Sequence, residues 1–331
     1  MTRVLVTGAT GFIGRTLVPV LLAQGYAVRV ALRVDRPVPP GVERAVVGEI
    51  GQATDWRAAL DGVDAVVHMA ARVHVMRESL PDPLSAFRAV NVDGSRRLGE
   101  AAAAAGVRRL VHLSSVKAVA DESGPEPLTE ETTPRPSTPY GISKLEAEQA
   151  LLDAAGETGP DVVNLRLPLV YGPGVKGNFL SLLGLCRRRL PLPLASVRNA
   201  RSLLYAGNLA DAVATALSTP DRLHGTYMIH DGAPLSTPDL IRAISSALGR
   251  APILLPCPPR LLEVAGMLLG RRAIVGRLTE NLVVDDRRLR ARLGWRPPFT
   301  PSDGLRGTAE WYKRTHECRD APSGMRLMQE P

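Results

Sequence analysis

Tyr140 and Lys144 stand four residues apart in the segment Tyr140-Gly-Ile-Ser-Lys144, at the start of a helical pattern. In a helix this spacing places both side chains on one face. A tyrosine is a poor base at neutral pH because its free pKa is about 10. A fixed ammonium beside the phenol favours the phenolate, and lowering the pKa by about three units takes about 4 kcal/mol of differential interaction. The pair therefore predicts a proton-transfer site in a closed cleft; the alternative is a tyrosine and a lysine on a solvated helix.

Ser114 and Ser115 directly follow a short apolar run at residues 110–113. A hydroxyl at the end of a strand can share the reacting oxygen of a substrate with Tyr140 and donate to it as charge develops. The alternative is a pair of serines that cap a turn. The sequence has no G-x-S-x-G segment and no obvious His/Asp partner set, which argues against a serine hydrolase.

The chain begins with an apolar run at residues 4–6, followed by Gly8, Gly11 and Gly14 and then a helical pattern over residues 12–22. A glycine-rich turn between a strand and a helix offers backbone N–H groups and a helix N-terminus, which suit a pyrophosphate. The order strand, glycines, helix therefore predicts a dinucleotide site rather than a plain tight turn. A cationic nicotinamide bound there would add to the effect of an ammonium on a nearby phenol.

The elements that must position these residues alternate along the chain. Further strands are predicted at residues 27–32, 44–47, 64–69, 110–113 and 162–167, with helical patterns between them, notably at 83–105 and 140–155. This alternation predicts an α/β fold with a Rossmann-type, doubly wound parallel sheet, in which ligands bind at the carboxyl ends of the strands.

After residue 170 the rhythm is lost, and the chain becomes rich in Pro, Leu and Arg. We expect a Rossmann domain at residues 1–170 and a smaller α/β substrate lobe mainly at residues 171–314, part of which can return to the sheet. The polar stretch at residues 315–331 has no periodicity and is expected to be a disordered tail.

The composition narrows the function classes. The chain has 331 residues, a net charge of +8 and only 4% aromatic residues, so the basic surplus lacks the stacking rings of a nucleic-acid interface. The three cysteines, Cys186, Cys257 and Cys318, are far apart, which argues for a reducing compartment without a disulfide framework or a metal site. With no signal peptide at its start, the protein is expected to be cytoplasmic.

The longest apolar run, residues 264–270 behind Leu261 and Leu262, is too short to span a bilayer. We expect this run to form a core helix. The alternative is a membrane-surface patch together with Arg271 and Arg272.

Six segments together resemble the extended short-chain dehydrogenase/reductases, and within them the NAD(P)-dependent nucleotide-sugar epimerase/dehydratase group that includes the UDP-glucose and UDP-galactose 4-epimerases. The resemblance covers about residues 3–311. Its carriers are Thr7-Gly-Ala-Thr-Gly-Phe-Ile-Gly14, His68-Met-Ala-Ala71, Asn91-Val-Asp-Gly94, Leu113-Ser-Ser115, Tyr140-Gly-Ile-Ser-Lys144 and Arg166-Leu-Pro-Leu-Val-Tyr-Gly-Pro173.

The resemblance implies a role for each matching residue. Tyr140 would be the general base, Lys144 would bind the nicotinamide ribose and lower the pKa of the tyrosine, and Ser115 would take the hydroxyl role. The expected cofactor-binding residues are Gly8, Thr10, Gly11, Phe12, Ile13, Gly14, Arg33, Arg36, Glu49, Ile50, Ala70, Ala71, Asn91, Ser114, Leu167 and Val170. The expected substrate-binding residues are Arg72, His74, Asn178, Arg201, Arg277 and Glu280. Arginine suits a diphosphate because its planar fork of donors matches the phosphate oxygens.

Three departures from the family pattern bear on the reaction. Val116 and Lys117 stand where 4,6-dehydratases carry Asp-Glu, so a dehydratase is not expected. The usual Val-Tyr-Gly that follows reads Ala118-Val-Ala120, which alters the substrate wall. The second strand is followed by Arg33 rather than an acidic residue, with Arg36 nearby, a pattern that accommodates a 2′-phosphate; the alternative is that Asp35 reaches the ribose. The cofactor is therefore NAD or NADP, and Arg33 favours NADP.

The resemblance implies an enzyme acting at C4 of a UDP-activated hexose, foremost a 4-epimerase that passes through a transient 4-keto sugar. The alternative is an NADPH-dependent 4-ketoreductase of a UDP-4-keto-6-deoxy-N-acetylhexosamine, because residues 71–77 resemble a bacterial branch linked to surface-polysaccharide sugars. A more distant alternative is a non-catalytic NADP-binding sensor. Family members often form homodimers through the helix of the tyrosine and the long helix before it, and we expect a homodimer here.

Overall fold

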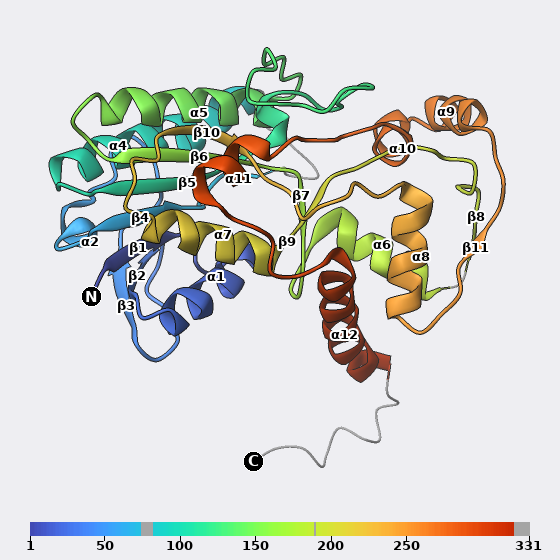
Figure 1. Ribbon diagram of the computed structural model, residues 1–331, viewed down its shortest axis with the longest axis horizontal. Helices are drawn as coiled ribbons and strands as arrows, with labels where there is room; N and C mark the ends of the chain where they lie inside the picture. Colours follow the sequence, from blue (N-terminus) through green and yellow to red (C-terminus); the bar gives the residue numbers. More distant parts are fainter. Residues whose placement is uncertain (74–81, 189, 321–331) are drawn as a thin grey trace.

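The computed structural model describes residues 1–73, 82–188 and 190–320. Figure 1 shows a lobe built on a parallel sheet and, beside it, a smaller lobe of mainly helical elements. The N-terminus lies at the far end of the sheet lobe, and the last helix belongs to the smaller lobe. No helix in the described part of the chain is both long and apolar enough to cross a membrane.

A seven-stranded parallel sheet forms the first lobe, with the strand order β10-β6-β5-β4-β1-β2-β3. The strands are β1 (Arg3–Thr7), β2 (Ala27–Leu32), β3 (Val42–Val46), β4 (Ala65–His68), β5 (Arg109–Ser115), β6 (Asp161–Leu167) and β10 (Gly225–Met228). The order reverses between β1 and β4, which lie side by side, and such a switch point is where ligands bind in open α/β sheets. The predicted Rossmann-type sheet is confirmed.

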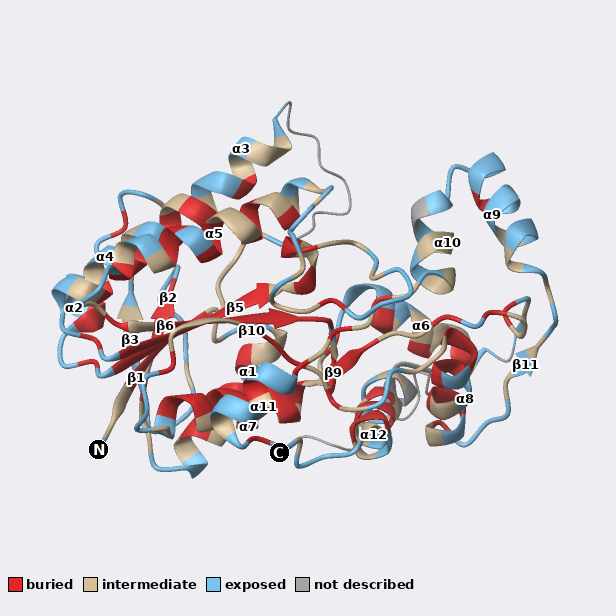
Figure 2. Cartoon of the chain, turned by 45° about the horizontal axis from the view of Figure 1, so that its top comes forward, coloured by how far each residue is buried: buried red, intermediate tan, exposed pale blue. Residues whose placement is uncertain are grey.

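Helices cover both faces of this sheet (Figure 2). On one face the apolar side chains of β1, β2 and β6 pack against α1 (Phe12–Ala23), α7 (Ala206–Ser218) and α11 (Arg287–Leu293). On the other face, α2 (Arg57–Leu60), α4 (Gly94–Ala104) and α5 (Pro139–Ala155) bury their apolar side chains against the sheet. The strands are buried on both faces, which explains why they appear in the sequence as continuous apolar runs.

The helical run predicted at residues 83–105 consists of three consecutive segments. They are α3 (Pro83–Arg88), a π-helical turn η1 (Ala89–Asp93) and α4. The Asp82 side chain accepts a hydrogen bond from Ser85 N and caps the start of α3. A π turn inside a helix often marks a functional site, and Asn91 lies at the centre of this one.

The smaller lobe has its own core, formed by apolar side chains that include Phe179, Ile241 and Tyr312. Its helices are α6 (Gly177–Arg187), α8 (Thr237–Ala247), α9 (Pro259–Leu268), α10 (Arg272–Thr279) and α12 (Pro301–Asp320). Its strands form two short parallel pairs, β7 (Leu169–Tyr171) with β9 (Leu203–Tyr205) and β8 (Pro191–Leu192) with β11 (Ile253–Leu254). A short 3₁₀ turn, η2 (Val116–Ala118), follows β5 in the first lobe.

Three segments beyond residue 170 belong to the sheet lobe, namely α7, β10 and α11. β10 pairs with β6 at the edge of the main sheet, and α11 packs on the same sheet through Leu289. Helix α12 continues to Asp320, so residues 315–320 of the expected tail are helical. The rest of that stretch lies outside the described residues.

The core helix predicted at residues 264–270 is wrong. In α9 and the turn that follows, Val264 is 53% exposed, Met267 62% and Leu268 83%. The apolar period of a helix is the same whether its apolar stripe faces inward or outward, so the sequence alone did not reveal the direction.

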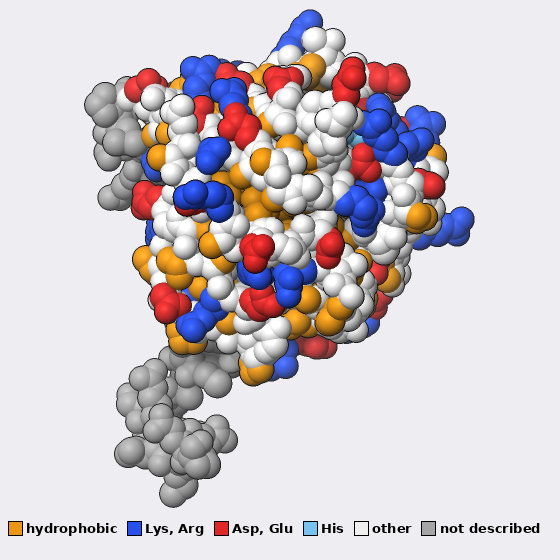
Figure 3. Space-filling model, turned by 90° about the vertical axis from the view of Figure 1, so that its left-hand side faces the viewer, with side chains coloured by type: hydrophobic (Ala, Val, Ile, Leu, Met, Phe, Trp, Pro, Cys, Tyr) orange, Lys and Arg blue, Asp and Glu red, His pale blue; other side chains and the backbone are white. Residues whose placement is uncertain are grey.

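Figure 3 shows one end of the sheet lobe, and the surface in this view has no continuous basic stripe. This view looks at the end of the molecule near α2, and Lys and Arg side chains there alternate with Asp and Glu. Several are paired, such as Arg57 with Asp55 at 2.6 Å and Arg29 with Glu43 at 2.8 Å. A mixed surface of this kind is an ordinary solvated one.

Candidate active site

The glycine turn lies at the switch point of the sheet. Gly8 has φ of +70°, and a Cβ there would lie 2.8 Å from Ala70 N at the end of β4, so only glycine fits without strain. Gly11 N donates to Gly8 O at 3.0 Å and closes the turn before α1. Among the described residues no side chain caps the N-terminus of α1, and its first turn has no acidic residue. Free N–H groups and a positive helix end therefore face the position that a pyrophosphate would take.

Ser115, Tyr140 and Lys144 come together at the carboxyl end of β5. Thr138 accepts a hydrogen bond from Gly141 N at 3.1 Å and starts α5. A Cβ at Gly141 would lie 2.4 Å from Lys117 O, so this glycine allows α5 to approach the segment after β5 closely. As a result the Tyr140 phenol is hydrogen-bonded to the Ser115 side chain. Ser115 is therefore a hydrogen-bonding neighbour of Tyr140, and the catalytic roles of the two residues stay a prediction.

Burial of the Tyr140 phenol raises its pKa, and the hydrogen bond to Ser115 opposes that effect. The Lys144 ammonium points instead at β5, where Nζ lies 2.7 Å from His112 Nε2 and 2.8 Å from Leu113 O. Burial lowers the pKa of Lys144 to about 8, and the Glu148 carboxylate opposes the shift. In this arrangement Ser115, rather than Lys144, is the group that favours the phenolate.

His112 is the side chain that holds Lys144. Its Nδ1 lies 2.8 Å from Asn164 Oδ1, so Nδ1 carries the proton and Nε2 accepts the hydrogen bond from Lys144. Burial, together with the charge of Lys144, lowers the pKa of His112 well below its usual value. A neutral imidazole is therefore a fixed acceptor for the ammonium of Lys144.

One turn beyond Lys144, Glu148 continues the buried polar face of α5. Its carboxylate accepts two hydrogen bonds from Arg166 Nε, at 3.1 and 3.2 Å, and one from Nη2 at 2.8 Å. The Ser114 hydroxyl also donates to Glu148 Oε1. Ser114, expected to border the cofactor, is therefore part of the support under Lys144 and is 4% exposed.

A chain of buried hydrogen bonds joins β1 to α5, the helix that carries Tyr140 and Lys144. Thr7 Oγ1 accepts from Met69 N and Ala70 N, both at 3.1 Å, and donates to His68 Nδ1 at 2.8 Å. His68 Nε2 then donates to Ser95 Oγ at 3.0 Å, and Ser95 donates to Asn91 O at 2.5 Å. Burial lowers the pKa of His68 to about 3, so this imidazole is neutral.

The Asn91 side chain continues this network to α5. Its amide nitrogen donates to Arg72 O at 3.0 Å and to Ser143 Oγ at 2.9 Å, and its oxygen accepts from Arg72 N at 2.7 Å. The Ser143 hydroxyl donates to Tyr140 O at 2.8 Å. These hydrogen bonds fix the positions of β1, the π turn η1 and the first turn of α5 relative to one another.

Arg72 lies close to Tyr140 through an aromatic neighbour. Its guanidinium carbon is 5.5 Å from the centre of the Phe87 ring, and that ring meets Tyr140 edge-on at 6.1 Å. Arg72 is thus within one side chain of Tyr140, and its contact with a substrate stays a prediction. His74, expected on the same wall, lies outside the described residues.

Other expected cofactor contacts surround the same edge of the sheet. Arg33 and Arg36 are exposed after β2, and Arg33 Nη1 lies 3.7 Å from Glu49 Oε1. Ile50 packs on the face of the sheet that α2, α4 and α5 cover, beside Gly94. The remaining positions fall on the glycine turn and α1 (Thr10, Phe12, Ile13, Gly14), after β4 (Ala70, Ala71), at the end of β6 (Leu167) and in β7 (Val170).

Three of the expected substrate residues gather in the smaller lobe. Arg201 Nη1 donates to Glu280 O at 2.9 Å. Burial lowers the pKa of Arg201, with the Glu280 charge opposing the shift and the Arg277 charge adding to it. Burial raises the pKa of Asp121, but hydrogen bonds with Ser137 and Lys117 lower it overall, with a smaller contribution from the charge of Arg277. Asp121 pairs with Lys117 at 3.0 Å. Asn178, at the start of α6, is exposed, and no described contact joins it to this group.

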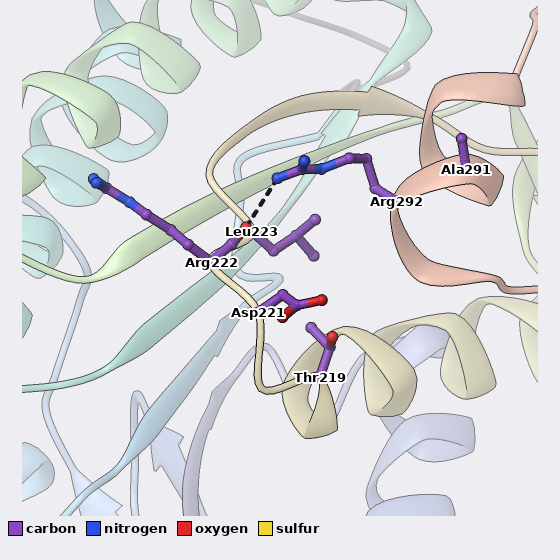
Figure 4. Close-up of a pocket in the computed structure, with 6 residues that line it drawn as sticks. All are labelled: Thr219, Asp221, Arg222, Leu223, Ala291 and Arg292. Carbon is purple, nitrogen blue, oxygen red and sulfur yellow. Dashed lines mark hydrogen bonds between the residues drawn. The ribbon is translucent and has the colours of Figure 1, made fainter.

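A cavity of about 380 Å³ lies on the opposite side of the sheet lobe (Figure 4). Its wall includes Leu223 and Arg222, whose backbone N–H and guanidinium, respectively, donate to Asp161 at the first residue of β6. Arg292 Nη2 donates to Arg222 O at 3.0 Å across the cavity. Because this is the amino end of the strands, the cavity is remote from Tyr140 and is not the active site.

Sequence reasoning did not assign the residues that position the catalytic group. His112, Asn164, Arg166, Ser95 and Ser143 act through tertiary contacts that no local spacing shows. Glu148 did carry a signal, because it stands at Tyr140 + 8 and Lys144 + 4 on one helical face. A carboxylate continuing the face of a catalytic pair would have indicated that this face is buried.

The comparisons with known proteins agree with this geometry. A sequence model of the "NAD dependent epimerase/dehydratase family" matches residues 4–229. A UDP-glucose 4-epimerase of Vibrio cholerae is 37% identical over 312 residues, which cover 93% of this chain and 95% of the relative.

Two solved structures share the fold over nearly their whole length. MoeE5 in complex with UDP-glucuronic acid and NAD is 28% identical with a TM-score of 0.74, covering 95% of this chain and 99% of that one. The UDP-glucose 4-epimerase of Thermus thermophilus in complex with NAD is 30% identical with a TM-score of 0.72, covering 94% and 99%. Both hold NAD, so the preference for NADP predicted from Arg33 has no support from them.

The glycine turn at the switch point, the Ser115–Tyr140–Lys144 group and the match of most of the chain lead to one conclusion. The chain belongs to the NAD dependent epimerase/dehydratase family and is an enzyme of the extended short-chain dehydrogenase/reductase kind.

Proposed function

We propose that this enzyme is an NAD-dependent 4-epimerase of a UDP-hexose. The observation that carries the proposal is the hydrogen-bonded Ser115–Tyr140 pair at the sheet edge where the glycine turn also lies. The resemblance to UDP-glucose 4-epimerases supports C4 as the reacting carbon.

The chemistry that NAD supplies when bound is the reversible acceptance of a hydride from C4. Tyr140, as the phenolate, takes the proton of the C4 hydroxyl, and Ser115 donates a hydrogen bond to the same oxygen as its charge changes. The sugar becomes a 4-keto sugar, turns over in the site and regains the hydride on its other face. Tyr140 then returns the proton, so no net oxidation remains.

Lys144 has two tasks in this proposal. Its ammonium binds the ribose of the dinucleotide and adds positive charge beside the phenol, which lowers the pKa of Tyr140 when the cofactor is in place. Holding NAD also requires the backbone of the glycine turn, where a Cβ at Gly8 would fill the space against Ala70 N at 2.8 Å. The residues present therefore fit a dinucleotide.

The charged group Arg201, Arg277 and Glu280 would bind the UDP part of the substrate. Two guanidinium groups supply the donors for a diphosphate, and the carboxylate is an acceptor for ribose hydroxyls. The charge of Arg277 acts on Asp121, which pairs with Lys117, and the backbone N–H of Lys117 donates to the Ser115 hydroxyl. Binding energy from this end of the substrate would hold C4 against the tyrosine.

The NAD form of the cofactor is supported by Glu49. A 2′-phosphate near Arg33 would also meet the Glu49 carboxylate, which lies 3.7 Å from that guanidinium. Repulsion between the phosphate and this carboxylate would disfavour NADP. The contact is exposed on both sides, so we expect only a modest preference.

The test begins with purified protein and no added nicotinamide. We expect the unfolded protein to release NAD, and the folded protein to interconvert UDP-glucose with UDP-galactose, or the corresponding N-acetylhexosamines, as followed by chromatography. A Tyr140→Phe variant should bind NAD but lose the interconversion. Tyr26→Phe, whose hydroxyl lies beside α7 and donates to Ala214 O at 3.5 Å, should keep both. Wild-type activity in Tyr140→Phe would overturn the mechanism.

The second candidate is an NADPH-dependent 4-ketoreductase, favoured by the exposed Arg33 and Arg36 and by the absence of an acidic residue at the end of β2. It makes the opposite prediction in the same experiment. The site would be empty after purification, NADPH would bind more tightly than NADH, and the enzyme would reduce a UDP-4-keto-6-deoxy-N-acetylhexosamine without interconverting 4-epimers.

A homodimer also stays a proposal. The surface formed by α3, α4 and α5 is where the resemblance places the contact. Light scattering across a range of protein concentrations would show twice the monomer mass if the proposal is right and the monomer mass if it is wrong.

A further inference from the structure

Helices α9 and α10 form a hairpin at the far end of the smaller lobe, away from the sheet (Figures 1 and 2). Of the fifteen strongly exposed large apolar side chains in the described part of the chain, six lie between residues 261 and 274. They are Leu261, Val264, Met267, Leu268, Leu269 and Ile274. Single exposed apolar residues are ordinary, whereas such a concentration indicates a contact surface.

The apolar stripe of α9 faces away from the protein. Leu261, Val264 and Leu268 follow the i, i+3, i+7 spacing of one helical face, and they are 61%, 53% and 83% exposed. The opposite face of α9 carries Gly266, which is buried, and Leu262, which packs on the core of the lobe. A helix of a globular protein normally has the reverse arrangement.

The hairpin cannot hide this stripe by rotating α9. A Cβ at Gly266 would lie 2.5 Å from Val275 Cγ2 on α10, so the two helices touch where the side chain is absent. Any other residue of α9 turned into that position would clash with Val275. Leu278 fixes the other end of α10 on the core of the lobe. The outward direction of the stripe is therefore built into the packing.

Basic side chains surround the apolar face. Between residues 260 and 277 the chain has four arginines (Arg260, Arg271, Arg272 and Arg277) and one acidic residue, Glu263. All four arginines are exposed. Two of them, Arg271 and Arg272, form the turn directly after the most exposed leucines. Apolar side chains at a tip with arginines beside them match the interface of a bilayer with anionic headgroups.

This combination distinguishes a lipid surface from the other occupants. A second copy of the chain would bring the same excess of positive charge against itself, which opposes association. A nucleic acid would require rings that stack on bases, and residues 259–279 contain no aromatic residue.

We propose that the α9–α10 hairpin is a docking surface for the anionic face of a lipid bilayer. The leucines enter the boundary between headgroups and acyl chains, and Arg260, Arg271 and Arg272 bind the headgroup phosphates, whereas Arg277 belongs to the substrate-binding group. The contact is peripheral and reversible, because the apolar face is short. The proposal is independent of the proposed reaction, since none of these leucines belongs to the active site.

The test is sedimentation of the full-length protein with vesicles of phosphatidylcholine, with or without phosphatidylglycerol. Wild type should sediment with the anionic vesicles, bind the neutral ones much more weakly, and be released by added salt, because screening weakens the attraction. Binding to neither type of vesicle would overturn the proposal. Equal binding to both, unaffected by salt, would overturn the part assigned to the arginines.

Two variants separate the apolar and the basic contributions. Arg271→Gln with Arg272→Gln should weaken binding to anionic vesicles on the order of 20- to 30-fold, as about 1 kcal/mol per basic residue converts. Leu261→Gln with Leu268→Gln should weaken it at least as much. Val34→Gln with Val46→Gln changes two exposed apolar side chains elsewhere, at 52% and 57%, and should leave binding unchanged.

Each double variant must fold as the wild type does, and thermal unfolding of each protein is the check. Because the substituted side chains are exposed, the unfolding temperature should stay that of wild type. If the leucine variant instead abolishes a concentration-dependent dimer and no protein binds vesicles, the face belongs to a second copy and the lipid proposal is wrong.

Discussion

Helices α5 and α9 both depart from the usual pattern of a globular protein, in which a helix buries its apolar side chains and exposes its charged ones. The buried face of α5 contains Ser143, Lys144 and Glu148, which are 0%, 2% and 3% exposed. The exposed face of α9 contains Leu261, Val264 and Leu268. One helix buries charge and the other exposes apolar area.

The difference lies in what each helix has around it. Every charge on the buried face of α5 has a designated partner: His112 and Leu113 O for Lys144, and Arg166 for Glu148. The exposed stripe of α9 is left uncovered by the described part of the chain. Buried polar groups are tolerated only with partners, and a concentration of exposed apolar groups indicates a missing one. The polar groups of α5 therefore have their partners inside the protein, whereas the apolar stripe of α9 is the surface that we propose docks on a bilayer.

The largest effect is expected at Tyr140. Tyr140→Phe removes the proton acceptor and should lower kcat by about 10²- to 10⁴-fold while NAD binding is kept. No substitution on α9 touches the reacting atoms, so Leu268→Gln should leave kcat in solution unchanged. A loss of turnover in Leu268→Gln of similar size would break the division of roles between the two helices.

The buried ion pair of α5 should be the next most sensitive feature. Arg166 and Glu148 are 6% and 4% exposed at their side chains and 2.8 Å apart, so Glu148→Gln leaves a buried guanidinium without its counter-charge. We expect a loss of about 3–5 kcal/mol in the free energy of unfolding, measured with urea.

The matched control for that variant is on the same helix. Glu146 pairs with Arg88 at the surface, where the two side chains are 32% and 48% exposed. Glu146→Gln should cost less than about 1 kcal/mol, because solvent screens the pair. Equal losses in the two variants would mean that Glu148 is not buried as described.

The apolar side chains of the two helices offer a third comparison. Leu151 on α5 is 0% exposed and packs between the sheet and α4, so Leu151→Ala should cost about 2–5 kcal/mol. Leu268→Ala, at a side chain 83% exposed, should stay within about 0.5 kcal/mol of wild type. A large loss for Leu268→Ala would show that α9 is covered in solution.

The buried ammonium predicts a pH dependence. Burial lowers the pKa of Lys144 from 10.5 to about 8, so between these values the unfolded chain binds more protons than the folded one. The contribution of Lys144 to stability therefore rises with pH across this range, by about 3 kcal/mol in total. The stability advantage of Lys144→Met over wild type should shrink by that amount from pH 8 upward. A constant difference in urea unfolding would contradict the buried charge.

Much of the fold followed from local pattern. The second strand was predicted with its observed bounds, Ala27–Leu32, because a buried parallel strand is a continuous apolar run. The catalytic helix begins within one residue of its predicted start, at Pro139, since the Thr138 cap and the proline fix it. The glycine turn was predicted because its three glycines stand between an apolar run and a helical pattern.

Other features were out of reach because they depend on tertiary contacts. The bond from His68 to Ser95 joins residues 27 apart in sequence, and the one from Asn91 to Ser143 joins residues 52 apart. The direction of the α9 stripe depends on Gly266 meeting Val275, which the helical period does not contain. The preference for NADP has no support from the NAD-bound relatives, and the sequence did not show that Glu49 lies beside Arg33.

The most direct test of the central claim follows the hydrogen at C4. UDP-glucose carrying deuterium at C4 is incubated in ordinary water with the purified protein and no added nicotinamide, and the products are analysed by NMR. We predict UDP-galactose that keeps its deuterium at C4, because the same hydride leaves and returns while Tyr140 moves only the proton of the hydroxyl. Epimer that has lost its deuterium to water, or no epimer from this or the N-acetylated substrate, would contradict the account.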